Sequence, residues 1–95
     1  MHRYYCFKID KWDRPINKKP GMPRARNQRE AVEMYAETSW SDKPFAAFKV
    51  LHLNCKPSDL DGMSEEKLLE GDWDWWIYDK DLNVLTGDEV AVVVL

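Results

Sequence analysis

Glycine, cysteine and histidine are all scarce in this 95-residue sequence, with four, two and two copies. No C-x-x-C pair occurs, and a structural zinc site needs four ligands at short spacings, so we expect no metal. The cysteines Cys6 and Cys55 are too few for the disulfide framework of a small secreted domain. We expect both thiols to be free and partly buried. Neither G-x-G-x-x-G nor the phosphate-binding loop motif is present, so no cofactor is predicted.

Long hydrophobic runs are also lacking. The longest, residues 90–95, has six residues, whereas a membrane-spanning helix needs roughly 20. Residues 1–9 do not follow the pattern of a secretory signal, so we expect a cytoplasmic protein. Its length favours a single domain over residues 1–95, and the 44% of hydrophobic residues is enough for a core.

The sequence offers little catalytic chemistry. Asp79 and Asp81 begin a stretch like a calcium-binding loop, but Val84 and Val90 stand where that loop requires glycine and glutamate. A nucleophile needs a base beside it, and the one histidine expected to be ordered, His52, falls within an apolar strand. The sequence therefore predicts a protein that is not an enzyme.

Charge is divided unevenly along the chain. Residues 1–29 hold nine basic and two acidic residues, a net charge of +7, whereas residues 30–95 hold five basic and fifteen acidic residues, a net charge of −10. Two interpretations follow. The fold either interleaves the two halves so that the charges pair, or it separates them into basic and acidic patches that attract charged partners.

Hydrophobic periodicity predicts the elements. Strands are expected at residues 3–9, 45–53, 73–79 and 90–95, a main helix at about 28–39 and a short helix at about 64–70. Asn27 and Ser64 are the expected helix caps, with Gly71 as the residue after the short helix. Residues 10–26, rich in proline and basic side chains, are expected to form a long loop. The resulting fold is α+β, with a mostly antiparallel sheet of about four strands and both helices packed on one face.

Three of the five tryptophans lie in the strand at 73–79. Alternation places Trp73 and Trp75 on one face and Trp76 and Tyr78 on the other. We expect Trp73 and Trp75 to be core residues. Trp76 and Tyr78 become binding residues if their face of the sheet is open, and scaffold if helices cover it.

The helix sequence Arg29-Glu30-Ala31-Val32-Glu33-Met34-Tyr35-Ala36-Glu37 follows an opening strand in a short acidic chain. Over about residues 1–53 this arrangement resembles the small α+β proteins encoded by bacteriophages and mobile elements, among them anti-CRISPR inhibitors. The resemblance implies a protein without an active site that occupies a partner's surface inside a bacterial host. Such inhibitors often present carboxylates where the partner expects nucleic-acid phosphates.

The first functional hypothesis is therefore inhibition or modulation of a host protein, or of a protein–nucleic-acid complex, through an acidic, aromatic surface. Its predicted residues are Asp59, Asp61, Glu65, Glu66, Asp72, Asp74, Trp76 and Tyr78. The alternative is a small accessory protein that binds nucleic acid through the basic segment. Its predicted residues are Lys11, Trp12, Arg14, Lys18, Lys19, Arg24 and Arg26. A third possibility is a self-associating structural protein in which tryptophans form a homodimer interface.

Overall fold

A computed structural model describes residues 2–16, 21–38, 44–54, 62, 64–86 and 88. Its elements follow in the order β1 (His2–Ile9), β2 (Arg24–Ala25), α1 (Gln28–Thr38), β3 (Ala47–His52), α3 (Glu65–Glu70) and β4 (Asp74–Tyr78). The strands form one sheet in the order β2-β1-β3-β4, and every neighbouring pair is antiparallel. The predicted α+β fold with a four-stranded antiparallel sheet is confirmed.

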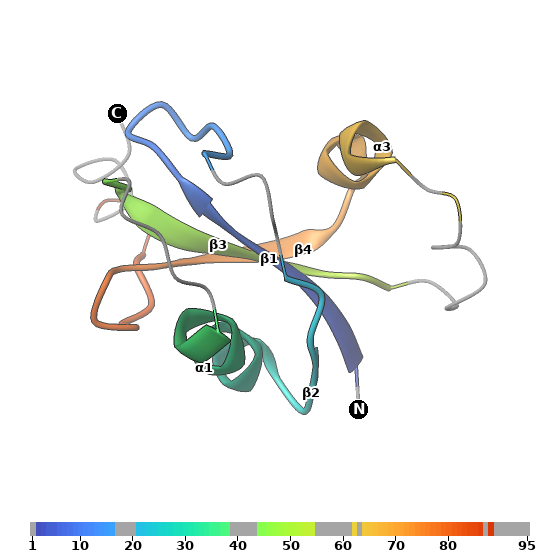
Figure 1. The fold of residues 1–95 in the computed structure, drawn as a ribbon, viewed down its shortest axis with the longest axis horizontal. Helices are drawn as coiled ribbons and strands as arrows, with labels where there is room; N and C mark the ends of the chain where they lie inside the picture. Colours follow the sequence, from blue (N-terminus) through green and yellow to red (C-terminus); the bar gives the residue numbers. More distant parts are fainter. Residues whose placement is uncertain are drawn as a thin grey trace.

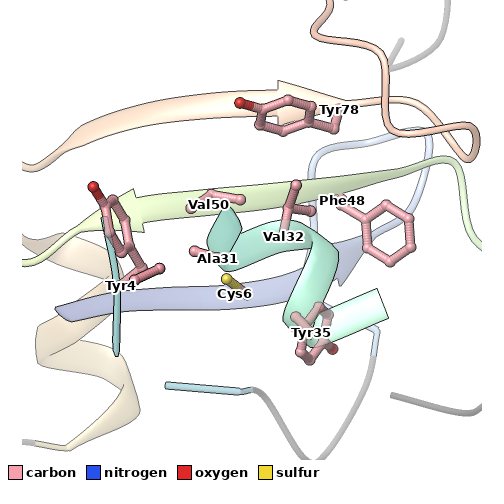
Figure 2. Close-up of a cluster of buried hydrophobic side chains, with 9 residues drawn as sticks. Tyr4, Cys6, Ala31, Val32, Tyr35, Phe48, Val50 and Tyr78 are labelled. Carbon is pink, nitrogen blue, oxygen red and sulfur yellow. The ribbon is translucent and has the colours of Figure 1, made fainter. Parts of the chain in front are cut away.

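One face of the sheet is closed by α1 (Figure 1). The helix contributes Ala31, Val32 and Tyr35 to a buried cluster with strand residues such as Cys6 and Val50. Figure 2 shows these helix side chains pointing at the strands. Phe48 closes the cluster, with its ring edge-on to Tyr35 at 6.1 Å between ring centroids. We call this the sealed face, because its central members have relative exposures of 5% or less.

The opposite face has a separate cluster. Alternate residues of the strands, including Tyr5, Phe7 and Leu51, pack there with Leu68 of α3. Figure 1 shows α3 and the segment 10–16 (bright blue) on this side of the sheet, with α1 on the other. We call this the open face, for reasons given with the site below. The prediction that both helices pack on one face is therefore wrong. Both sides of the strands carry apolar groups, and each side needs its own cover.

Local sequence explains where α1 begins. The Asn27 side-chain oxygen accepts a hydrogen bond from the Glu30 backbone N–H at 2.8 Å, which confirms Asn27 as the predicted cap. The ion pair from Arg29 to Glu33 is also present at 3.0 Å. Because this pair is exposed, it stabilises the helix by only about 0.3–0.5 kcal/mol.

The short helix α3 is held by its two ends. Ser64 accepts a hydrogen bond from the Lys67 backbone N–H, as predicted for a cap. After the helix, Gly71 has an extended backbone rather than the left-handed one typical of a C-terminal glycine. Its role is steric, because a Cβ at Gly71 would overlap the Trp73 indole. That indole donates a hydrogen bond to the Leu68 carbonyl at 2.7 Å and so ties α3 to the start of β4.

The basic segment 10–26 was predicted to lack regular structure, and this is wrong in its second half. Gly21 and Cys6 exchange two backbone hydrogen bonds at 2.8 and 2.9 Å, and β2 continues this pairing along the edge of β1. In the first half, the Asp10 carboxylate caps a tight turn by accepting from the backbone N–H groups of Trp12 and Arg14. Glycine at position 21 also leaves room for the Tyr35 ring, which would lie 2.5 Å from a Cβ there.

Two predictions about the fold fall outside the described residues: the strand at 90–95 and the free thiol of Cys55. Cys6 is buried and free, as expected. Within the described part of the chain, no helix is long and apolar enough to cross a membrane.

Candidate interaction surface

The tryptophan strand β4 exposes a different aromatic residue from the one expected. Trp75 is 54% exposed, although alternation suggested a core residue. Tyr78 is only 2% exposed and belongs to the sealed face, and Trp76 packs partly buried against the same cluster. Tyr78 therefore cannot serve as an exposed anchor. The reason is that α1 covers the face of β4 on which Trp76 and Tyr78 lie.

Trp75 is accessible because the described segments that pack on the open face leave most of its ring uncovered. At one end α3 packs through Leu68, and at the other the segment 10–16 reaches Lys49, whose ammonium lies 3.3 Å from Asp13. Between these covers, the Lys49 Nζ stands 5.0 Å from the centroid of the Trp75 ring. Trp75 thus projects from a hydrogen-bonded strand, and the Lys49 ammonium lies against its ring. More than half of the residue's surface is still in solvent.

Exposed carboxylates lie on α3 and at the start of β4, the strand that carries Trp75. Glu66 and Glu70 lie on α3, and Asp72 and Asp74 lie on either side of Trp73. Because Trp73 ties α3 to β4, these acids all lie near the junction of the helix and the strand. Asp74 alternates with Trp75, so its side chain lies on the opposite side of this edge strand. The ion pairs found among the described residues, Arg29–Glu33 and Lys49–Asp13, involve none of these four acids. We define the Trp75 surface as Trp75 with these acids: Glu66, Glu70, Asp72 and Asp74.

The structure places the predicted acidic residues unequally. Glu66, Asp72 and Asp74 are exposed and belong to the Trp75 surface. Asp59 and Asp61 lie outside the described residues. Glu65 begins α3, but its side chain is among the parts not described.

The Asp79 carboxylate forms hydrogen bonds within the turn that follows β4. One oxygen of its carboxylate accepts hydrogen bonds from the backbone N–H groups of Asp81 and Asn83, both at 2.9 Å. This is the ordinary use of aspartate in a turn. Among the described residues, no group of three or more histidine, cysteine or acidic side chains is arranged to hold a metal ion.

The basic residues predicted for nucleic-acid binding are divided between the two ends of β1. Lys11, Trp12 and Arg14 are exposed beyond its last residue, whereas Arg24 and Arg26 lie at its beginning, beside β2. The length of β1 separates these groups by roughly 20 Å. Lys18 and Lys19 lie outside the described residues. The basic residues therefore do not form one continuous site.

A shallow hollow lies beside Trp12. It has a volume of about 280 Å³ and is lined by Asp10, Lys11, Trp12, Pro44, Phe45 and Ala46. Trp12 is 59% exposed, and the Lys11 ammonium lies 4.5 Å from its ring centroid. A basic side chain next to an exposed ring is the arrangement that stacks and holds a nucleotide.

The sealed face buries several titratable groups, among them Cys6 and Lys8. Burial raises the pKa of Cys6 to about 12, so the thiol is protonated at neutral pH and is a poor nucleophile. Burial also lowers the pKa of Lys8, whose ammonium lies 4.9 Å from the Phe45 ring centroid. His52, the other residue considered for chemistry, stacks on Tyr4 at 5.0 Å between centroids. The prediction that the chain is not an enzyme stays a prediction.

Sequence reasoning missed Trp75, Lys49 and Arg3 as surface residues. One signal was available for the first two. Lys49 falls on the same side of β3 as Leu51, and Leu51 lies directly opposite Trp75. A lysine in the middle of an apolar strand indicates that its face reaches solvent. Arg3 gave no comparable signal, because its neighbour Arg24 belongs to a strand of only two residues.

Comparison of the chain with protein-family models, with curated proteins and with solved structures gives no match in any of the three.

Proposed function

We propose that this chain is a non-enzymatic binding protein that uses the Trp75 surface to occupy a basic patch on another protein. The observation that carries the proposal is the 54% exposure of Trp75 on a hydrogen-bonded strand, next to four exposed carboxylates without ion-pair partners among the described residues. Exposed tryptophans are enriched among the residues that dominate binding energy. Carboxylates around such an anchor favour a partner rich in lysine and arginine.

The chain itself provides an example of the contact we expect. Lys49 places its ammonium 5.0 Å from the Trp75 ring and 3.3 Å from the Asp13 carboxylate. A cation over the face of an indole is attracted by about 0.5–1 kcal/mol at an exposed site and more when the site is desolvated. A partner arginine or lysine would repeat this arrangement on the remaining exposed part of the ring, with Asp72 as its carboxylate.

The finer form of the proposal is inhibition. A basic patch with this chemistry is one that normally holds nucleic-acid phosphates, and a protein that covers it competes with the nucleic acid. This is the mode of action implied by the resemblance to phage-encoded inhibitors of the anti-CRISPR type, with a bacterial protein or protein–nucleic-acid complex as the host target.

The test is a capture experiment from a lysate of the producing cells, with nuclease treatment as one arm. We expect a protein to stay bound after nuclease, to be lost with Trp75→Ala, and to be retained with Trp12→Ala. Trp12 is a matched control because it is equally exposed but lies on the segment beyond β1. Once purified, the captured protein should lose nucleic-acid binding when this chain is added.

Two results would contradict the proposal. One is loss of the captured protein after nuclease, which indicates contact through nucleic acid. The other is unchanged capture by a double Asp72→Lys, Asp74→Lys variant, because reversed charges should repel a basic partner. Light scattering on the free protein tests the homodimer alternative, which requires twice the 11.3 kDa mass of the chain.

The hollow beside Trp12 favours a second candidate, direct binding of a single nucleic-acid strand. Base stacking on one aromatic side chain contributes about 1–3 kcal/mol. If this candidate is right, Trp12→Ala weakens binding of a fluorescent single-stranded oligonucleotide and Trp75→Ala does not. Equal effects of the two variants would remove it.

A further inference from the structure

Two arginines face each other where the sheet begins. Arg3 of β1 lies directly opposite Arg24 of β2 in the antiparallel register. Directly opposed residues share a face of the sheet with their Cβ atoms about 5 Å apart, and like charges in this position destabilise the pair. Arg26, exposed just after β2, adds a third positive charge.

Arg3 is partly buried, and its guanidinium is poorly satisfied. Its Nε atom is buried and has no hydrogen-bond partner among the described residues. Its Nη1 donates to the Met22 sulfur at 3.8 Å, a weak acceptor. A buried donor on a charged group destabilises the folded protein when it has no acceptor, so the Arg3 guanidinium is expected to destabilise the free protein.

No carboxylate of the described residues relieves this charge. The ion pairs found there join Arg29 to Glu33 and Lys49 to Asp13, and neither includes Arg3, Arg24 or Arg26. On the open face, the next residues across the sheet from Arg3 are apolar. Leu53, just after β3, is the neighbour of Arg3 on the side away from β2, and its backbone N–H donates to the Arg3 carbonyl at 3.0 Å. The exposed carboxylates of the Trp75 surface lie around α3 and the start of β4, toward the other edge of the sheet.

We propose that Arg3 and Arg24 form a binding site for a phosphate group. A phosphate oxygen accepts from the Nε–H and an Nη–H of one guanidinium at the same time, a bidentate geometry that a lysine does not offer. One phosphate between the two side chains neutralises the like-charge pair. It also supplies an acceptor for the Arg3 Nε once the side chain turns to bring this buried atom to the surface. The shared chemistry is the phosphate oxyanion, whether free or part of a nucleic-acid backbone.

This site extends the proposed function without resting on it. The Trp75 surface lies toward the β4 edge and the arginine pair toward the β2 edge, three strands apart in the sheet order. A target that carries both a basic protein surface and a bound nucleic acid would meet both. The two proposals depend on different residues, so each can fail while the other stands.

The test uses the full chain with two probes, inorganic phosphate and a short single-stranded oligonucleotide. The readout is the NMR signal of the arginine side-chain Nε–H groups. We expect phosphate to shift the Arg3 and Arg24 signals and to raise the melting temperature. The oligonucleotide should produce the same shifts at a lower concentration, because several phosphates are present on one strand.

Variants assign the effect to the pair. Arg24→Met should weaken phosphate binding about tenfold, the usual scale for a lost charged hydrogen bond. It should also reduce the salt dependence of oligonucleotide binding by about one phosphate contact. Arg14→Met is the matched control, since Arg14 is also exposed but lies beyond the far end of β1.

If free phosphate shifts the arginine signals and the oligonucleotide does not, the site belongs to a small phosphorylated molecule. If the Arg3 Nε–H signal stays unmoved by both probes, or if Arg14→Met weakens binding as much as Arg24→Met, the proposal is overturned.

Discussion

The two faces of the sheet use alternate residues of the same strands, yet one is sealed and the other is open. An 11-residue helix covers the sealed face and a six-residue helix covers part of the open one. At 1.5 Å per residue these helices are about 16 and 9 Å long, so α3 cannot cover the length of the strands. Trp75, Lys49 and the Arg3–Arg24 pair all belong to the open face. The residues available for binding are therefore those that the shorter helix leaves uncovered.

The difference between the faces also concerns charge. The sealed face buries a thiol, three tyrosines and one lysine, Lys8, beside aromatic rings. The open face places its charges in or near solvent, where they can meet a partner. Part of the charge is separated in this way: Arg24 and Arg26 are exposed beside β2, and Glu66, Glu70, Asp72 and Asp74 are exposed on α3 and at the start of β4. Other charges are mixed, since Arg14 and Asp13 are both exposed on the segment beyond β1.

The largest effect should come from the sealed face. Phe48→Ala removes a ring that packs 4.9 Å from Phe45 and 6.1 Å from Tyr35. We expect the free energy of unfolding to fall by about 3–5 kcal/mol, as for other buried phenylalanines. Urea denaturation measures the free energy of unfolding.

Trp75→Ala is the comparison variant on the open face. It should lower the free energy of unfolding by less than about 1 kcal/mol, as most surface substitutions do. Similar losses in the two variants would break the distinction between the faces.

A second difference is sensitivity to alkaline pH. The folded-state pKa of Cys6 is about 12, above its ordinary value of 9.0. Its contribution to stability is therefore fully present below pH 9 and is lost as the pH rises toward 12. The loss is at most about 1.4 kcal/mol per pH unit for one group. Burial raises the pKa values of Tyr4 and Tyr78 as well, which adds further loss above pH 10.

The measurement is the free energy of unfolding between pH 8 and pH 10 for the native sequence and for Cys6→Ala. The variant should show a clearly weaker decline over this interval, because it lacks the buried Cys6 thiol, which can ionise at these pH values only after unfolding. Parallel curves for the two proteins would show that Cys6 is not the group responsible.

A smaller effect tests how α3 is attached to the open face. Trp73→Phe keeps a ring but removes the 2.7 Å hydrogen bond to the Leu68 carbonyl. We expect a loss of about 1 kcal/mol, with faster hydrogen exchange at the backbone amides of Lys67 and Leu68. Trp12→Phe is the control, since Trp12 is exposed on the segment beyond β1. Unchanged exchange in α3 would mean that Leu68 packing alone holds the helix.

The smallest change should be a gain in stability. Arg3→Met removes a poorly satisfied guanidinium opposite Arg24, so we expect a stabilisation of about 0.5–1 kcal/mol at low salt. Thermal unfolding at low and high salt is the measurement, and salt should reduce the gain by screening the charge pair. A destabilised variant would indicate that Arg3 is already satisfied in the free protein.

Much of the fold was predictable from the sequence. Asn27 followed by an apolar stripe marks α1, and alternation marks β1, β3 and β4 within one or two residues. The aspartate turn after β4 was also recognisable, because Asp79 is followed by residues whose amides it can cap. These features depend on interactions between residues close in sequence, which a local pattern records.

The candidate site was only partly predictable. Asp72, Asp74 and Glu66 were expected to be exposed and are exposed. The aromatic anchor was assigned to the wrong residues, since Tyr78 is buried and Trp75 is not. Alternation states that Trp75 and Trp76 point to opposite sides, but it contains no information on which side the longer helix takes.

Sequence by itself determined an α+β chain with antiparallel strands, a capped main helix and charges of opposite sign in its two parts, because periodicity, caps and composition are local properties. Only the tertiary structure decided that α3 lies opposite α1, that Arg24 meets Arg3, and that Trp75 is left in solvent. Each of these depends on which distant segments pack together, and that choice follows from covering two apolar faces with helices of unequal length.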